Sequence, residues 1–315
     1  MNYRLNIFGF LGSDQLRDRD ETDRSTGNYG FQDQRMALHW VQENIGAFGG
    51  DPQKVMLFGQ SSGAASVGLH LVTPSSYGLY SSAIMMSGGF GPWSVQHMVR
   101  KELWFERLMN QTHCRDVDCL VSLSADELLS AYMAIPDGRC CRKAKGLGSY
   151  PEIPWAASID GVELSAHPWD LLKKGQVNQV PILIGSTQED GEFFTTVAKN
   201  LSNKDFQTLF QAKYQSSQAQ AELYSLESLE SPAAPSEGSS PSEGWWSALR
   251  VMTDKHYYCP GHFCRRSLVT GPAPTAHGVF GYVFAHSATG TAKHSDDLLF
   301  VFMRAYVLNK FWTLL

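Results

Sequence analysis

The stretch Phe48–Gly63, F-G-G-D-P-Q-K-V-M-L-F-G-Q-S-S-G, indicates the fold of the whole chain. A Gly-Gly-Asp-Pro turn precedes the apolar strand Val55–Phe58, and the strand runs into the G-Q-S-S-G sequence centred on Ser61. The small residues that follow suit a helix packed closely on a sheet. Strand, glycine-flanked serine and helix together predict a sharp turn that lifts the Ser61 hydroxyl clear of the sheet edge. In such a turn, side chains at positions 59 and 63 are expected to collide with neighbouring backbone, which explains both glycines.

Composition limits the class of protein. The chain has 315 residues, of which 43% are hydrophobic and 18% charged, and its net charge is −5, as in ordinary globular proteins. This charge gives no reason to expect a nucleic acid partner. No apolar run reaches the ~18 residues of a membrane span. The first ten residues lack the features of a secretory signal and are typical of a buried strand, so we expect the chain to begin inside a domain.

Strands and helices alternate along the sequence. Apolar runs bounded by glycine or polar residues predict buried strands, and apolar spacing of three and four predicts a helix over Phe31–Phe48. This alternation favours an α/β fold with a mostly parallel central sheet flanked by helices. The predicted strands are Tyr3–Phe10, Val55–Phe58, Ala83–Met86, Val180–Gly185 and Val279–Ala285.

Three segments depart from the alternation. Residues 94–150 show helical patterns, Met98–Leu108 and Ala125–Met133, and no clear strand, which predicts a helical excursion off the sheet. Residues 225–244 are rich in Ser, Glu, Pro and Ala and predict a flexible surface loop. Leu298–Leu315 predicts a final apolar helix. Because no composition break divides the chain, residues 1–315 are expected to form a single domain.

A serine hydroxyl needs a base to take its proton, and the base needs a carboxylate to orient it. In chain order, carboxylate and histidine should each follow a strand. Glu189 and Asp190 follow the strand that ends at Gly185, and the sequence leaves both open as the acid, or as caps of the next helix. For the base, His286 ends the last strand and His294 lies in the loop after it, a position that favours His294.

Six cysteines are present, and none has the spacing of a zinc site, so no metal is predicted. Disulfides in an oxidising compartment explain them better. Two N-x-[ST] sequons, at Asn110 and Asn200, favour the same compartment.

Taken in order, these motifs resemble the type-B carboxylesterases, the family of cholinesterases, bile-salt-type lipases and the non-catalytic neuroligins. The resemblance covers nearly the whole chain and implies an α/β-hydrolase fold. The segments that carry it are Met1–Arg4 with Gly9–Leu11, Asn28–Gln34 with Ala37–Val41, Phe48–Gly63, Ser87-Gly88 with Trp93, Ile159–Gly161, Pro168–Gly175, Tyr258–Pro260 and Tyr282–His286.

The resemblance implies roles for individual residues. Ser61 matches the nucleophile of a serine carboxylic ester hydrolase, Asp190 its acid and His294 its base, while His286 matches a non-catalytic histidine. The Ser62 N–H matches an oxyanion donor. Further residues with implied roles are Trp93, Phe193 and Phe194 as walls of an acyl pocket, or as ordinary core aromatics, and Cys114 with Cys119 as a small disulfide loop.

The implied substrate is a small or lipid-like ester, with no cofactor or metal, and the implied location is the secretory pathway. The oligomeric state stays open. Gln60 replaces a glutamate on which cholinesterases rely, which disfavours a choline ester, and Ser295 replaces a glycine after the base.

The family's H-G-G-type oxyanion loop and first strands should precede Met1, and Cys259 matches a cysteine whose partner lies beyond Leu315. The sequence is therefore expected to be incomplete at both ends, with an empty central slot in the sheet and little activity of its own. Two alternatives to an esterase stay open, namely a truncated or inactive paralogue and a neuroligin-like adhesion protein.

Overall fold

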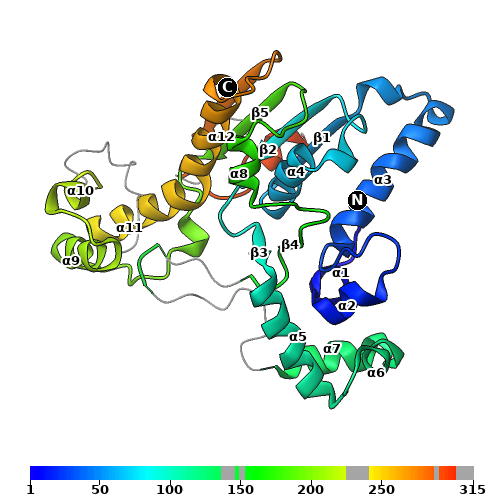
Figure 1. The fold of residues 1–315 in the computed structure, drawn as a ribbon. Helices are drawn as coiled ribbons and strands as arrows, with labels where there is room; N and C mark the ends of the chain where they lie inside the picture. The colour runs from blue at the N-terminus through cyan, green and yellow to red at the C-terminus, as the bar shows by residue number, and fades with distance from the viewer. Residues whose placement is uncertain (136–145, 149–152, 225–240, 287–290, 303–315) are drawn as a thin grey trace.

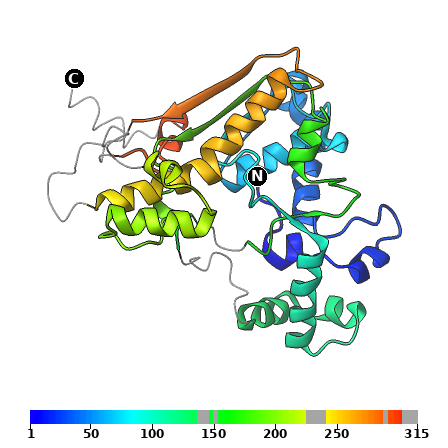
Figure 2. The same ribbon diagram turned by 60° about the vertical axis from the view of Figure 1, so that its left-hand side comes forward.

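The computed structural model describes residues 1–135, 146–148, 153–224, 241–286 and 291–302. Its centre is a sheet of four parallel strands in the order β1-β2-β5-β6 (Figures 1 and 2). The strands are β1 (Met56–Gln60), β2 (Ser82–Met86), β5 (Ile182–Thr187) and β6 (Val279–Phe284). Four of the five predicted strands, and the parallel sheet itself, are thereby confirmed.

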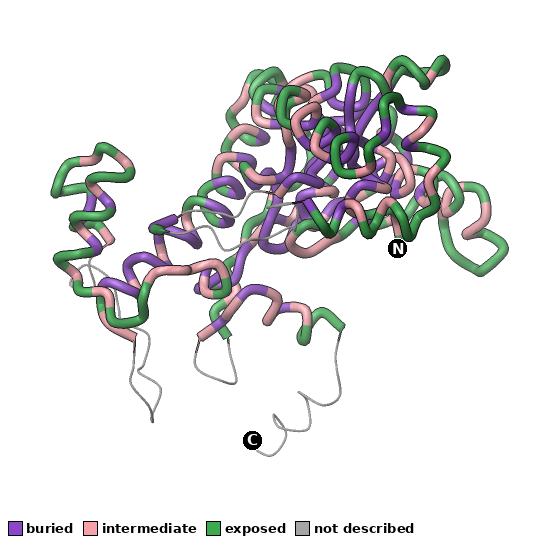
Figure 3. Tube along the Cα trace, turned by 90° about the horizontal axis from the view of Figure 1, so that it is seen from below, coloured by how far each residue is buried: buried purple, intermediate pink, exposed green. Residues whose placement is uncertain are grey.

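Helices cover one face of this sheet. They are α3 (Tyr29–Asn44), α4 (Ser62–Val72), α8 (Pro168–Lys173) and α12 (Cys259–Thr270). The buried core lies between them and the sheet, whose two middle strands, β2 and β5, are more buried than its outer strands. In Figure 3 the purple, buried stretches gather inside the main body of the molecule. Short connections complete this half of the fold: η1 (Ile45–Phe48), η2 (Pro52–Lys54) and η3 (Pro74–Ser76).

The opposite face of the sheet contacts the chain's last described residues. The ring of Phe58 lies 6.0 Å from that of Phe302, and the ring of Phe284 lies 5.0 Å from that of Phe300. The helix predicted over 298–315 is described only as α13 (Leu298–Val301), and residues 303–315 lie outside the described residues.

A group of short helices projects from one end of the sheet, at the bottom of Figure 1. It consists of α5 (Met98–Thr112), α6 (Val117–Ser122) and α7 (Ala125–Ala134), which confirms the predicted helical excursion. The expectation of no strand in this region was wrong, because β3 (Val95–His97) pairs in parallel with β4 (Ala157–Ile159). Three residues are too short to show a strand period, and this pairing depends on a partner far away in the sequence.

The first segment is a helix, α1 (Asn6–Phe10), so the strand predicted over 3–10 was wrong and does not join the sheet. Ile7 and Phe10, three residues apart, are buried in one cluster with Trp104 of α5. Helical turns place such a pair on one side of the chain, whereas a strand would place it on opposite faces. An apolar run this short fits either structure, and packing against α3 and α5 decides it.

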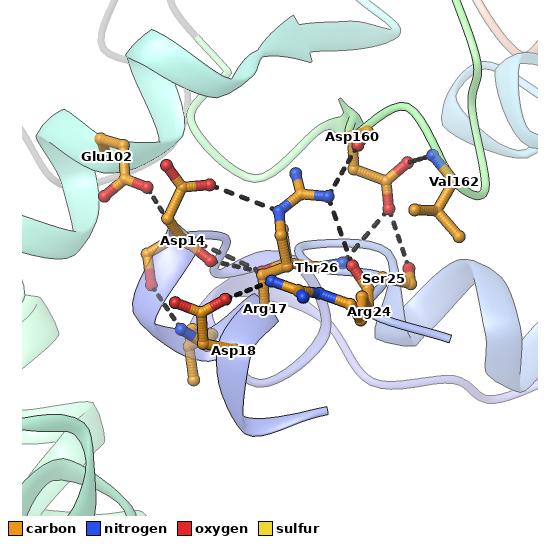
Figure 4. A network of polar contacts seen from close by, with 11 residues as sticks. Asp14, Arg17, Asp18, Arg24, Ser25, Thr26, Glu102, Asp160 and Val162 are labelled. Atoms are coloured by element: carbon orange, nitrogen blue, oxygen red, sulfur yellow. Dashed lines mark hydrogen bonds and ion pairs between the residues drawn. The ribbon is translucent and has the colours of Figure 1, made fainter. Parts of the chain in front are cut away.

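The polar loop after α1 contains α2 (Asp14–Arg19) and is held to β4 by Asp160 (Figure 4). The Asp160 carboxylate accepts hydrogen bonds from the Ser25 hydroxyl at 2.9 Å and from the backbone N–H groups of Thr26 and Val162. Arg17 donates to the Asp160 carbonyl at 3.0 Å. Asp160, part of the Ile-Asp-Gly motif, therefore has a structural explanation: it joins two segments distant in the sequence.

Lys101 of α5 is fully buried and makes a similar connection. Its ammonium donates to the carbonyl of Phe10 at 3.0 Å, to that of Pro154 at 3.2 Å and to that of Ala156. These bonds compensate the cost of burying the charge and attach α5 to α1 and to the segment before β4.

A third group of helices precedes α12 and lies at the left of Figure 1, at the edge of the molecule away from α3. It contains α9 (Asn203–Tyr214), α10 (Gln218–Glu222), α11 (Glu243–Thr253) and η6 (Asp254–Tyr258). The loop predicted over 225–244 lies mostly outside the described residues, and its last two positions are helical, because α11 begins at Glu243.

Cys114 and Cys119 form a disulfide, as the resemblance implied. Cys259 and Cys264 are free thiols, and Cys140 and Cys141 lie outside the described residues. Within the described ranges, no helix has the length and apolar character that crossing a membrane requires.

Candidate active site

Ser61 lies at a strained turn between β1 and α4. Its backbone has φ 57° and ψ −120°, a region that side-chain-bearing residues rarely adopt. The turn is fixed by a hydrogen bond from the Ser61 N–H to the Met86 carbonyl at 2.9 Å and by one from the Ala65 N–H to the Ser61 carbonyl at 3.0 Å. Such strain persists only where the surrounding structure holds it, and it is concentrated at functional sites.

Two glycines allow this turn. A Cβ on Gly59 would lie 2.3 Å from the backbone of Gly63, and one on Gly88 would lie 2.4 Å from the Ser61 carbonyl oxygen. Gly59 is therefore explained as predicted, and Gly88 supports the turn from the end of β2. The expectation for Gly63 was wrong, because a Cβ there would contact nothing within 4 Å. Gly63 instead supplies the backbone surface against which Gly59 packs.

Asp190 and His294 lie together at the carboxyl edge of the sheet, where the loops after β5 and β6 meet. The Nδ1 atom of His294 is 2.6 Å from Oδ1 of Asp190, and the other oxygen of Asp190 accepts the Thr187 N–H at 2.9 Å. Asp190 is fully buried and His294 is 8% exposed. Because the carboxylate only accepts hydrogen bonds, it holds the proton of His294 on Nδ1 and leaves a lone pair on Nε2.

Glu189, which the sequence left open as an alternative acid, has a different environment. It is 1% exposed, and its backbone N–H donates to the Ala292 carbonyl at 2.9 Å, so it joins the two loops that carry Asp190 and His294. Burial raises the pKa of Glu189 to about 7, and the nearby charge of Arg250 opposes this shift. The structure thus pairs Asp190, not Glu189, with His294.

The buried carboxyl of Glu189 should make stability depend on pH. Its folded pKa of about 7 lies above the ordinary 4.5, so the folded state retains a proton that the unfolded state releases. The contribution of this proton to the free energy of unfolding is therefore fully present below the ordinary pKa of 4.5, and it is lost as the pH rises through 7. In Glu189→Gln we expect this loss, up to about 3 kcal/mol, to disappear from urea unfolding curves measured across that window. Glu43→Gln, at an exposed carboxylate, is the control, and an unchanged pH dependence in Glu189→Gln would contradict the prediction.

Aromatic rings enclose the imidazole of His294. The Phe194 ring, in η4 (Glu192–Phe194), stands edge-on at 5.4 Å and the Tyr257 ring lies at 5.1 Å. Phe193, by contrast, is 66% exposed. The two neighbours predicted as pocket walls are thus separated: Phe194 packs on the histidine and Phe193 points away from the core. His286 packs edge-on against Phe300 at 5.3 Å.

Further groups around His294 were missed or given no role at the sequence level. Asp297 is buried, and burial together with the charge of Asp190 raises its pKa, while the Tyr282 hydroxyl donates to it at 2.9 Å. The Gln60 side-chain nitrogen is 3.2 Å from Nε2 of His294. Gln60 carried a signal, since it directly precedes Ser61, and Tyr282 lies in a segment that carries the resemblance, although that segment gave it no role. Tyr257 carried no signal.

His294 contacts Gln60, the residue directly before Ser61. Among the residues that the structure describes, no hydrogen bond joins Ser61 Oγ to His294, and the nitrogen that could accept one faces Gln60 instead. The N–H groups of the first turn of α4, that of Ser62 included, have no acceptor within the helix, as in any α-helix. These N–H groups carry partial positive charge, so an anion at this end of α4 would be stabilised.

A cavity of about 400 Å³ opens beside this turn. Trp93, partly buried, lines it together with Ser62 and Ser66 of α4, and the remaining wall is mostly apolar. The size and lining are those of a site for a small apolar group. Within the described ranges, no group of three or more His, Cys, Asp or Glu side chains is placed to hold a metal ion.

Comparisons with known proteins agree with this architecture. Residues 1–313 match the model of the carboxylesterase family. The chain is 35% identical over 203 residues to acetylcholinesterase of Leptinotarsa decemlineata, covering 62% of this chain and 31% of that protein. It is 34% identical over 221 residues to cholinesterase of Mus musculus, covering 68% of this chain and 34% of that protein. The chain thus spans about a third of the length of these curated relatives.

Among solved structures, a carboxylesterase of Geobacillus stearothermophilus superposes with a TM-score of 0.72 at 29% identity, over 96% of this chain and 58% of that one. This likeness and the parallel sheet confirm the α/β-hydrolase fold expected from the sequence. With the match over nearly its whole length, the chain belongs to the carboxylesterase family.

Proposed function

We propose that this chain carries the nucleophile, base and acid of a serine esterase that hydrolyses carboxylic esters through an acyl-enzyme. The observation that carries the proposal is the 2.6 Å contact between His294 Nδ1 and Asp190 Oδ1, made at the sheet edge beside the strained turn of Ser61. Family membership supports the same chemistry. Glu189 instead joins the two loops through its backbone N–H, and His286 packs against Phe300.

In the acylation step, Ser61 Oγ attacks the ester carbonyl carbon while His294 Nε2 takes the hydroxyl proton. Asp190 keeps the imidazole oriented and stabilises the positive charge that forms on it. The oxygen of the tetrahedral intermediate becomes negative, and the Ser62 N–H at the N-terminus of α4 donates to it. The intermediate then collapses as His294 returns the proton to the alcohol, which leaves.

Deacylation repeats these steps with water. His294 Nε2 takes a proton from a water molecule, the hydroxide attacks the acyl carbon, and Ser61 leaves with its proton restored. The free acid is released, and no cofactor enters the balance.

The substrate class follows from the surroundings of Ser61. The mostly apolar cavity beside Ser62, with Trp93 in its wall, suits the acyl chain of a small or lipid-like ester. Gln60 next to the nucleophile is neutral and offers no charge to a cationic alcohol such as choline. A neutral ester is the substrate that these features favour.

We also infer a secretory location. The Cys114–Cys119 disulfide is stable in an oxidising compartment, and the sequon residues Asn110 and Asn200 are both exposed, as glycosylation requires.

Active-site labelling tests the proposed function. A fluorophosphonate reacts with an activated serine by forming an Oγ–P bond and releasing fluoride, so incubation of the purified full chain should place one adduct on the peptide that contains Ser61, as found by mass spectrometry. Denatured protein is the control for non-specific reaction. An inactive paralogue or an adhesion protein would leave Ser61 unlabelled, and that outcome would refute the proposal.

A further inference from the structure

The base nitrogen of His294 is already occupied in this structure. With the Nδ1 proton held by Asp190, Nε2 of the neutral ring has a lone pair, and the Gln60 amide nitrogen at 3.2 Å donates a hydrogen bond to it. Gln60 therefore engages the atom that, in the proposed function, must take the proton of Ser61. We propose that Gln60 is a positioning residue that holds His294 in its neutral form and competes with Ser61 for the base. This inference rests on the proposed function.

The surrounding contacts show which group has to move. The backbone of Ser61 is fixed by hydrogen bonds with Met86 and Ala65. The ring of His294 is held by Asp190 and packed between Phe194 and Tyr257. The side chain of Gln60 is half-buried and its amide has His294 as its hydrogen-bond partner. Rotation of the Gln60 side chain is thus the step that frees Nε2 for Ser61.

Charged and titratable groups already surround the ring of His294, so a change of charge at position 60 would alter the electrostatic balance at the ring. Asp190 faces Nδ1 from the loop after β5, and Asp297, at the start of α13, contributes a second buried carboxyl that is bonded to Tyr282. Tyr257 faces the ring from η6. Beside these groups, Lys293 and Glu192 pair with each other at 3.0 Å.

The neutral amide adds no charge at Nε2. A carboxylate at position 60 would only accept hydrogen bonds, so it would favour the protonated ring, in which both nitrogens donate.

Three variants test the proposal. Gln60→Met keeps the side-chain length and removes the hydrogen-bond donor. Gln60→Glu replaces the donor with a negatively charged acceptor. Gln53→Glu, the control, adds the same charge at an exposed residue of η2. The measurement is the second-order rate of fluorophosphonate inactivation over the pH range in which histidine titrates. Thermal unfolding of each variant confirms that it is folded.

Gln60→Met should react about five times faster than the wild type, because one ordinary hydrogen bond no longer competes for the base. Gln60→Glu should move the midpoint of the pH–rate curve upward by about one pH unit or more, while Gln53→Glu leaves it unchanged. A purely structural role for Gln60 would move no midpoint. A rate for Gln60→Met at or below that of the wild type, or an unmoved midpoint in Gln60→Glu, overturns the proposal.

A second readout does not depend on activity. The ¹⁵N signals of the His294 ring, assigned by their absence in His294→Gln, report which nitrogen is protonated. We expect protonation on Nδ1 alone in the neutral wild type, and a higher titration midpoint in Gln60→Glu. If Ser61 fails to react, the proposed function fails, while these signals still decide whether Gln60 holds His294 in its neutral form. Equal midpoints would refute that role.

Discussion

Ser61→Ala is expected to lower kcat for hydrolysis of a p-nitrophenyl ester by about a million-fold, the loss that follows when a serine nucleophile is removed. Without Oγ no acyl-enzyme forms, and Asp190 and His294 have no proton to move. The fold should survive, since serine and alanine both carry a Cβ and meet the same strain at φ 57°. The residual rate should therefore reflect the site and not unfolding, which thermal denaturation of both proteins checks.

Ser62→Ala is the matched control. Ser62 is the exposed neighbour of Ser61, and alanine retains the backbone N–H that the proposed mechanism uses. Its kcat should stay close to that of the wild type. If Ser62→Ala loses as much activity as Ser61→Ala, or if Ser61→Ala remains active, the assignment of the nucleophile is wrong.

Asp190→Asn should lower kcat by about ten-thousand-fold. The two oxygens of Asp190 accept from different donors, the His294 ring at 2.6 Å and the Thr187 N–H at 2.9 Å. Asparagine has a single oxygen, so one of these donors must face an NH₂ group. If the amide faces His294, it favours the wrong tautomer, in which Nε2 carries the proton and cannot act as a base.

Glu189→Gln separates the two adjacent carboxylates. Glu189 makes no hydrogen bond to His294 within the described part of the chain, and its burial favours the neutral form, which glutamine resembles. Its kcat below pH 7 should remain near that of the wild type. The pH–rate curves of both variants provide the measurement, and a larger loss in Glu189→Gln than in Asp190→Asn would reverse the assignment of the acid.

The predictions from the sequence that were wrong have two causes: contacts between residues distant in the sequence, and the local path of the backbone. Asn6–Phe10 forms a helix because Ile7 and Phe10 pack beside Trp104, which is nearly one hundred positions away. β3 exists because Val95 pairs with Ala157. A side chain at position 63 would meet no neighbouring atom, whereas one at position 59 would collide with the backbone of Gly63. In each case a partner distant in the sequence, or the path of the backbone, decided the outcome.

The sequence by itself determined the order of the central elements and the placement of the candidate residues. Neighbours along the chain decide where an apolar run ends and which residue follows it, so Ser61, Asp190 and His294 could each be placed after a strand. The tertiary structure decided which of these groups meet. Asp190 and His294 are 104 positions apart, and Gln60 and His294 are 234 apart. Such contacts form only when parallel strands bring their carboxyl ends to one edge, and no local pattern encodes which side chains then face each other.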